Sequence, residues 1–192
     1  MPIYKLEAFP RKVHLRDSKS AELRPMVAGD TAKLVEFFLQ VPAEDRYYLK
    51  DDVTSPKVLE GWASHLDYDR ALPLLAWDDG NVVGDAVLVR SRTGARSHIG
   101  EVRVVVHPEW RNRGLGSAMI RQLCDIAADA ELEKVIMELV ADREQEAITA
   151  AERMGFLRSA VIPEYFLDQK GHKHDLVVMV LPLGKWYEWW TF

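Results

Sequence analysis

The spacing of apolar residues changes along the chain, and each spacing predicts one kind of element. Spacings of three and four residues predict four helices. They begin at Asp30, after Pro56, at Leu115 and at Glu144, and Asp30 is a residue type that often caps a helix N-terminus. Short alternating or continuous apolar runs predict strands. These runs lie at 13–16, 21–24, 72–77, 82–89, 99–106, 135–140, 165–168 and 176–181.

The order of these elements predicts an α+β fold. From the second strand on, the chain reads strand, two helices, three strands, helix, strand, helix and two strands. The polar turns 78–81 and 169–172 join neighbouring strands as hairpins, so most strand pairs should be antiparallel. We therefore expect a mixed, mostly antiparallel sheet flanked by helices, with one central β-α-β crossover through the helix at Leu115.

The chain contains no visible repeat or linker, and its 192 residues suit a single core. We expect a leader with a hairpin strand over 1–20, the main domain over 21–183 and an aromatic tail over 184–192. Trp186, Trp189 and Trp190 in the tail share one helical face. Such aromatic density usually covers a surface, either on its own domain or on a second copy in a possible homodimer.

Composition excludes several classes of protein. The 30 acidic residues outnumber the 25 basic ones, so a general nucleic-acid binder or a polybasic membrane protein is not expected. No run approaches the roughly 18 apolar residues of a membrane span, and the N-terminus lacks a secretory signal. Cys124 has no partner for a disulfide, and we expect it to be buried in a protein of the reducing cytoplasm. His172 and His174 lie in a turn without enough further ligands for a metal site.

The strongest chemical signal is the junction between the strand 99–106 and the helix at Leu115. A tight Arg/Gly loop there should expose free backbone N–H groups, and the helix dipole adds positive potential. Gly114 and Gly116 allow a ligand to approach the backbone, while Arg111 and Arg113 add full charges. The loop therefore predicts a phosphate or pyrophosphate site.

Three other interpretations of this loop compete. A Walker A loop requires Gly-Lys-Ser/Thr, which is absent. A dinucleotide-binding fingerprint requires a third small residue where Met119 stands. Glu138 lies at the distance of the ribose-binding acid, but only one β-α-β unit is present. The last alternative is a strand-to-helix turn that binds nothing.

The wider pattern resembles the GNAT acetyltransferase superfamily. It consists of Arg111-x-x-Gly-x-Gly after an apolar strand, a long helix, a further strand, a shorter helix and then Gly155-Phe156. The segments 23–26 and 78–84 are also similar to that family, and the resemblance spans roughly 23–183. Within it, three segments look most like the acetyltransferase domain of bacterial protein-lysine acetyltransferases and their stand-alone relatives. These are 42–48, 66–70 and 100–106.

The resemblance implies acetyl-CoA (coenzyme A) as cofactor. Its pyrophosphate would lie on the loop amides, and its pantetheine arm would pair along the strand before the loop. The implied binding residues are Val104, Val105, Val106, Arg111, Asn112, Arg113, Gly114, Leu115, Gly116 and Ser117. Between residues 90 and 113 there are six arginines and two acids, a local charge of +4 that would suit a polyanion.

The resemblance also implies transfer of the acetyl group to a primary amine, on a protein lysine or a small molecule, by direct attack. An ammonium of pKa about 10.4 must lose a proton first, and Glu101 matches the position of the general base in the lysine-acetyltransferase relatives. The backbone N–H near Val104 would polarise the thioester carbonyl. Four acids after the first helix could form an acceptor wall: Glu44, Asp45, Asp51 and Asp52.

Two positions depart from the family pattern. Ala151 stands where many members have a tyrosine general acid, and Glu144 replaces an asparagine. Tyr165 is a possible substitute acid on the next strand. These departures keep open a catalytically silent CoA-binding regulatory module. An interaction protein that uses its aromatic tail is the third class of function.

Overall fold

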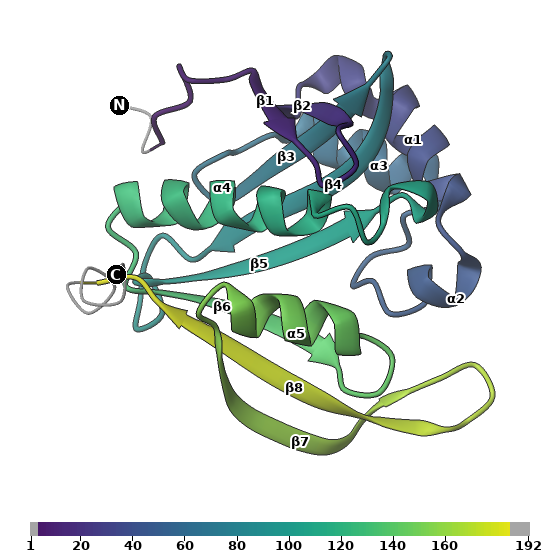
Figure 1. Ribbon diagram of the computed structural model, residues 1–192, viewed down its shortest axis with the longest axis vertical. Coiled ribbons are helices and arrows are strands. Elements are labelled where there is room, and N and C mark those ends of the chain that lie inside the picture. Colours follow the sequence, from purple (N-terminus) through teal and green to yellow (C-terminus); the bar gives the residue numbers. More distant parts are fainter. Residues whose placement is uncertain (1–3, 185–192) are drawn as a thin grey trace.

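The computed structural model describes residues 4–184, and within them all strands join one sheet in the order β1-β2-β3-β4-β5-β6-β8-β7 (Figure 1). The strands are β1 (Arg11–His14), β2 (Ser20–Pro25), β3 (Ala71–Asp78), β4 (Asn81–Arg90), β5 (Ile99–Val106), β6 (Lys134–Val140), β7 (Leu157–Leu167) and β8 (Lys173–Pro182). The helices are α1 (Thr31–Gln40), α2 (Ala43–Arg46), α3 (Pro56–Ser64), α4 (Leu115–Asp129) and α5 (Gln145–Arg153). Short 3-10 turns occupy Ala28–Asp30 and Pro108–Trp110.

Every strand pair is antiparallel except β5 with β6, which the crossover through α4 connects. The predicted α+β class and the single central β-α-β unit are thereby confirmed. The β5–β6 pairing covers only Ile99–Glu101 opposite Lys134–Ile136. Beyond Glu101 the two strands diverge toward the end where α4 begins (Figure 1). From Val102 to Val106, β5 pairs with β4 alone, so its other edge is open.

Helices cover both faces of the sheet (Figure 1). On one face lie α4 and α5, whose apolar stripes join a core that includes Met119, Leu123 and Ile148. On the other lie α1 and α3, which bury Phe37, Phe38 and Leu59 against the sheet. The α4 helix packs so closely on β4 that a Cβ on Gly84 would lie 2.9 Å from the sulfur of Met119. The predicted apolar stripe of α4 is confirmed.

Three details differ from the sequence predictions. The carboxylate of Asp30 does not cap α1; it accepts a bond from the Val27 amide at 2.8 Å and pairs with Arg24 at 2.7 Å. The short α2 was not predicted. Strand β7 begins at Leu157 and not at Tyr165. The sequence pattern missed its first half because most residues of this strand are exposed on both faces, so apolar and polar residues do not alternate along it.

The N-terminal hairpin is part of the same sheet, since β1 extends the edge formed by β2. Leu15 is buried in the main core, and the Arg16 amide donates to the carbonyl of Arg113 at 3.1 Å. The leader therefore contacts the loop before α4. The aromatic tail lies outside the described residues. In residues 4–184 we find no helix with the length and hydropathy needed to cross a bilayer.

Candidate active site

The loop between β5 and α4 is shaped by left-handed backbone at two positions. Asn112 has φ 60° and Gly114 has φ 91°, a conformation that glycine adopts without steric cost. Gly114 precedes α4, and no side chain caps the helix there. No backbone amide from Asn112 to Ser117 donates a hydrogen bond to another described residue. The helix therefore begins with a continuous run of unpaired donors, as the sequence predicted.

The two loop arginines are held by acids from distant parts of the chain. Arg111 donates to Asp45 of α2 at 2.9 Å, and Arg113 pairs with Asp17 of the N-terminal hairpin. Arg92 and Arg103, from the same basic stretch, pair with Asp67 and Glu101. The local charge of +4 counted along the sequence is thus largely neutralised in the folded chain.

The open edge of β5 lies directly beside the start of α4. A Cβ on Gly116 would lie 3.4 Å from Val106 Cγ2 and 4.0 Å from Val104 Cγ2, so glycine lets the helix begin close to the strand. All ten predicted cofactor-binding residues occupy this junction of β5, loop and α4. Unpaired amides and an unpaired strand edge meet there.

Glu101 lies where β5 and β6 separate and takes part in a charged cluster. Its carboxylate accepts bonds from Lys50 and from Arg103, each at 2.7 Å. Lys50 also lies 3.2 Å from Glu138 on β6, so its ammonium bridges the two diverging strands. Partial burial raises the pKa of Glu101, but the bonds from Arg103 and Lys50 outweigh burial and leave it below its usual value. The sequence analysis found Glu101 but did not connect Glu138 with it.

A pocket of about 420 Å³ lies on the same face of the sheet, beneath α1 and α3. Its lining is mostly apolar and includes Phe38, Trp62, Leu66, Val87 and Val105. Lys50 and Arg103 also line it, so the pocket reaches the partners of Glu101.

Of the predicted acceptor wall, only Asp51 lines this pocket within the described residues. Asp45 pairs with Arg111, Glu44 approaches Arg143 at 3.6 Å, and Asp52 accepts bonds from Thr54. Three of the four carboxylates thus take part in ion pairs or a turn outside this pocket, and the acceptor wall stays a prediction.

A further acid of the pocket lining is Asp85 of β4, which the sequence analysis missed. It is half-buried among apolar side chains, and no residue of the described range 4–184 donates to its carboxyl group. Desolvation raises the pKa of Asp85 to about 7. One signal was present in the sequence: an acid in the middle of the apolar run 82–89.

The positions that depart from the family pattern have ordinary structural environments. Ala151 is fully buried in α5 and Tyr165 is 55% exposed on β7. The Glu144 carboxylate accepts a 2.6 Å bond from the Val140 amide, and burial raises its pKa. None of these three side chains lies in the pocket.

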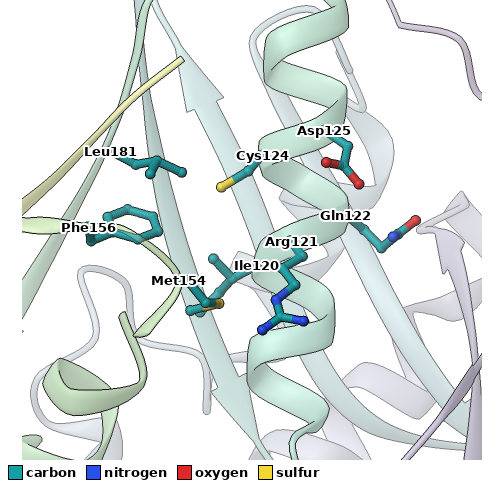
Figure 2. A pocket seen from close by; sticks show the side chains of 8 residues that line it. All are labelled: Ile120, Arg121, Gln122, Cys124, Asp125, Met154, Phe156 and Leu181. Carbon is teal, nitrogen blue, oxygen red and sulfur yellow. The ribbon is translucent and has the colours of Figure 1, made fainter. Parts of the chain in front are cut away.

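A second, smaller pocket of about 200 Å³ separates α4 from β8 and the turn after α5. Figure 2 shows the Cys124 thiol directed toward Phe156 and Leu181. Burial raises the pKa of Cys124 to about 12, so the thiol stays protonated and is a poor nucleophile. The expectation that Cys124 is buried is confirmed.

Comparison with known proteins identifies the family. The model of the acetyltransferase (GNAT) family matches residues 35–156, more than half of the chain. The chain belongs to this family. The match contains the charged cluster, the pocket strands and the β5–loop–α4 junction, and it confirms the family that the sequence motifs indicated.

Two curated relatives of this GNAT chain share part of its sequence. The L-amino acid N-acetyltransferase AaaT of Escherichia coli (strain K12) is 27% identical over 84 residues, which are 43% of this chain and 51% of AaaT. The glucosamine 6-phosphate N-acetyltransferase of Trypanosoma brucei brucei is 35% identical over 81 residues, 40% of this chain and 52% of the relative. The chain thus spans about half the length of the curated relatives it matches.

Solved structures confirm the GNAT fold. The GNAT domain of S. lividans PAT has a TM-score of 0.74 and 22% identity, with 90% of this chain and 96% of that chain covered. The structure of yncA from Salmonella typhimurium with its cofactor acetyl-CoA has a TM-score of 0.73 and 20% identity, covering 87% and 96% of the two chains. At these identities the likeness establishes the fold alone.

The raised pKa of Asp85 predicts a pH-dependent gain of stability for Asp85→Asn. The pKa of Asp85 is higher in the folded than in the unfolded chain, so the contribution of this residue to stability is most favourable below about pH 4 and is lost as the pH rises through 7. Each pKa unit corresponds to about 1.4 kcal/mol, so the variant should gain roughly 1–4 kcal/mol at pH 8 and little at pH 4. Thermal unfolding at both pH values measures this, with Asp51→Asn as the exposed control. An equal change at pH 4 and pH 8 contradicts the prediction.

Proposed function

We propose that this GNAT chain is an enzyme that transfers an acetyl group from acetyl-CoA to a primary amine by direct attack. The observation that supports this most strongly is the run of unpaired amides at the start of α4, beside the open edge of β5. Free amides at a helix N-terminus bind phosphate groups. An open strand edge can hydrogen-bond one more extended chain. Acetyl-CoA carries both a pyrophosphate and an amide-containing arm.

In this proposal each part of acetyl-CoA has its own residues. The pyrophosphate would bind the unpaired amides from Asn112 to Ser117 and the side chains of Arg111 and Arg113. Those guanidinium groups exchange Asp45 and Asp17 for phosphate oxygens. The pantetheine arm lies along Val104–Val106. When bound, acetyl-CoA would supply the acetyl group as an activated thioester; its C–S bond would break as the amine forms the C–N bond, and the sulfur would leave as a thiolate that takes a proton from solvent.

Glu101 is the proposed general base, and its ion pair with Lys50 lowers its pKa. The carboxylate of Glu101 is ionised at neutral pH because its pKa is lowered. It already accepts hydrogen bonds from Lys50 and Arg103. An acceptor amine that displaces Lys50 gains contact with Glu101 and also removes a cation that weakens the base. Glu101 then accepts the proton that the amine loses.

The acceptor in this proposal is a small amine or a lysine side chain that reaches the Glu101 cluster. The pocket beside the cluster is mostly apolar, which suits the methylene stem of either. A homodimer stays a prediction.

A second candidate function is a silent CoA-binding regulatory module. The observation that favours it is Ala151, which is fully buried and offers no general acid where many family members have one. This module would bind acetyl-CoA and acetylate nothing.

Replacement of the base separates the two candidates. Glu101→Gln should lower kcat/KM by about 10²–10⁴-fold, since the amine loses its proton acceptor, while the Kd of acetyl-CoA changes by less than about twofold. Thiol release with an amine panel and calorimetric titration measure the two quantities. Glu22→Gln, on the exposed side of β2, is the matched control. Absence of turnover by the unmodified chain on every amine, with acetyl-CoA bound, favours the silent module.

Substitution of Arg113 and of its ion-pair partner Asp17 should change the affinity for CoA in opposite directions. Arg113→Gln should weaken CoA binding about tenfold or more, because a bond between charged groups is worth roughly 1.5–3 kcal/mol. Asp17→Asn should strengthen it by up to about fivefold, since it frees Arg113 from an ion pair that is partly exposed. Calorimetric titration with CoA measures both. Arg158→Gln, in an exposed pair on β7, should change nothing. Unchanged affinity in Arg113→Gln contradicts the loop assignment.

Substitution of Lys50 should shift the dependence of kcat/KM on pH. Lys50→Ala removes a cation that lowers the pKa of Glu101, so that pKa should rise, and with it the pH at which activity is lost on acidification. The acidic limb of kcat/KM against pH measures this. Lys33→Ala, whose lysine pairs with Glu36 on α1, is the control. An unchanged limb, or one moved to lower pH, contradicts the role of Glu101 as base.

A further inference from the structure

The pocket contains one acid whose presence the acetyl-transfer proposal leaves unexplained. Asp85 projects from β4 among apolar side chains and has no partner in the described part of the chain. A carboxylate in such surroundings costs free energy unless a cation or a hydrogen-bond donor reaches it. Its missing partner can therefore come with the ligand.

Asp85 and Glu101 lie on the same face of the sheet, Asp85 in the lining of the pocket and Glu101 next to it through its partners Lys50 and Arg103. Asp85 pairs across the strands with Val105, which is four residues from Glu101 on β5. Residues four apart on a strand share a face and are separated by about 13 Å. Lys50 and Arg103, the partners of Glu101, line one end of the pocket, and Asp85 lines its sheet side.

Most of the surface between the two carboxylates is apolar; Arg103 of β5 also lies between them, and its guanidinium donates to Glu101 at 2.7 Å. Val87 and Val89 of β4 and Val105 of β5 form it on the sheet side, and Phe38, Trp62 and Leu66 cover it from the helices. An aliphatic chain would pack on this surface, and a cationic group at each end of that chain would pair with the two acids.

We propose that Asp85 binds a second ammonium group of the acceptor, so that the pocket selects a linear diamine with an apolar spacer of about eight carbons over a monoamine. This rests on the proposed function, because the other ammonium is the one that displaces Lys50 at Glu101 and Glu138 and receives the acetyl group. Asp85 is thus a specificity-determining residue.

Other charged groups face the same pocket and have to be separated from Asp85. They are Lys50, Asp51, His65, Asp67, Arg70 and Arg103. Lys50 and Arg103 are engaged by Glu101, and Asp67 by Arg92. His65 is the one histidine among them. Its Nδ1 lies 3.1 Å from the Gly61 carbonyl, which can only accept, and 3.0 Å from the Ser64 hydroxyl.

The test measures binding without acetyl-CoA, by calorimetric titration at pH 8 with octane-1,8-diamine and with octylamine. The unmodified chain should bind the diamine at least about tenfold more tightly, which is the affinity expected of one additional charge-assisted bond. Asp85→Asn should abolish that preference and leave octylamine binding within about twofold. Butane-1,4-diamine, which is too short to reach both acids, should show no preference over butylamine.

Two control variants make the result specific. Glu60→Gln removes an exposed acid of α3 that does not line the pocket and should retain the preference. The preference should also decline from pH 8 to pH 6 as Asp85 becomes protonated, and His65→Gln should leave this decline intact. Thermal unfolding confirms that each variant is folded.

The proposal is overturned if the unmodified chain binds both octyl ligands equally, or if Asp85→Asn retains the preference. Its failure is distinguishable from failure of the proposed function. Acetylation of octylamine and titration with acetyl-CoA test the enzyme without Asp85. Loss of the diamine preference in Asp85→Asn tests the pocket without acetyl-CoA.

Discussion

The structure of the candidate active site depends on where the pairing of β5 with β6 stops. The two strands form a parallel pair over three residues and then separate, which leaves the hydrogen-bonding edge of β5 open from Val102 to Val106. Because α4 connects these two strands, its unpaired N-terminus lies at the wide end of the gap. One local interruption of the sheet therefore provides both the open edge and the position of the helix N-terminus beside it.

Charge in this site is arranged by contacts between distant segments. The loop arginines, Lys50 and Glu101 all take part in ion pairs. Each pair is at least partly exposed, so each contributes little to the free energy of folding. Together these pairs balance the charges of the candidate site.

Much of the fold was predictable from local pattern. The strand 99–106, the loop and the apolar stripe of α4 were all found, because glycine, proline and helical spacing act within one or two turns of chain. Strand β7 was found only in part, since its residues are exposed on both faces and pairing with β8 alone maintains it. Asp85 was missed for a related reason: an acid in an apolar run has no meaning until the lining of the pocket around it is known.

The sequence by itself determined that a strand enters a glycine-containing loop and a long amphipathic helix, and it identified the family from that motif. These features are local, so residue type and spacing fix them. The tertiary structure decided which charges meet. Asp45 reaches Arg111 across 66 residues and Asp17 reaches Arg113 across 96, and these contacts neutralise a patch that is basic only along the chain. Electrostatic interactions depend on distance in space, and only the folded sheet determines those distances.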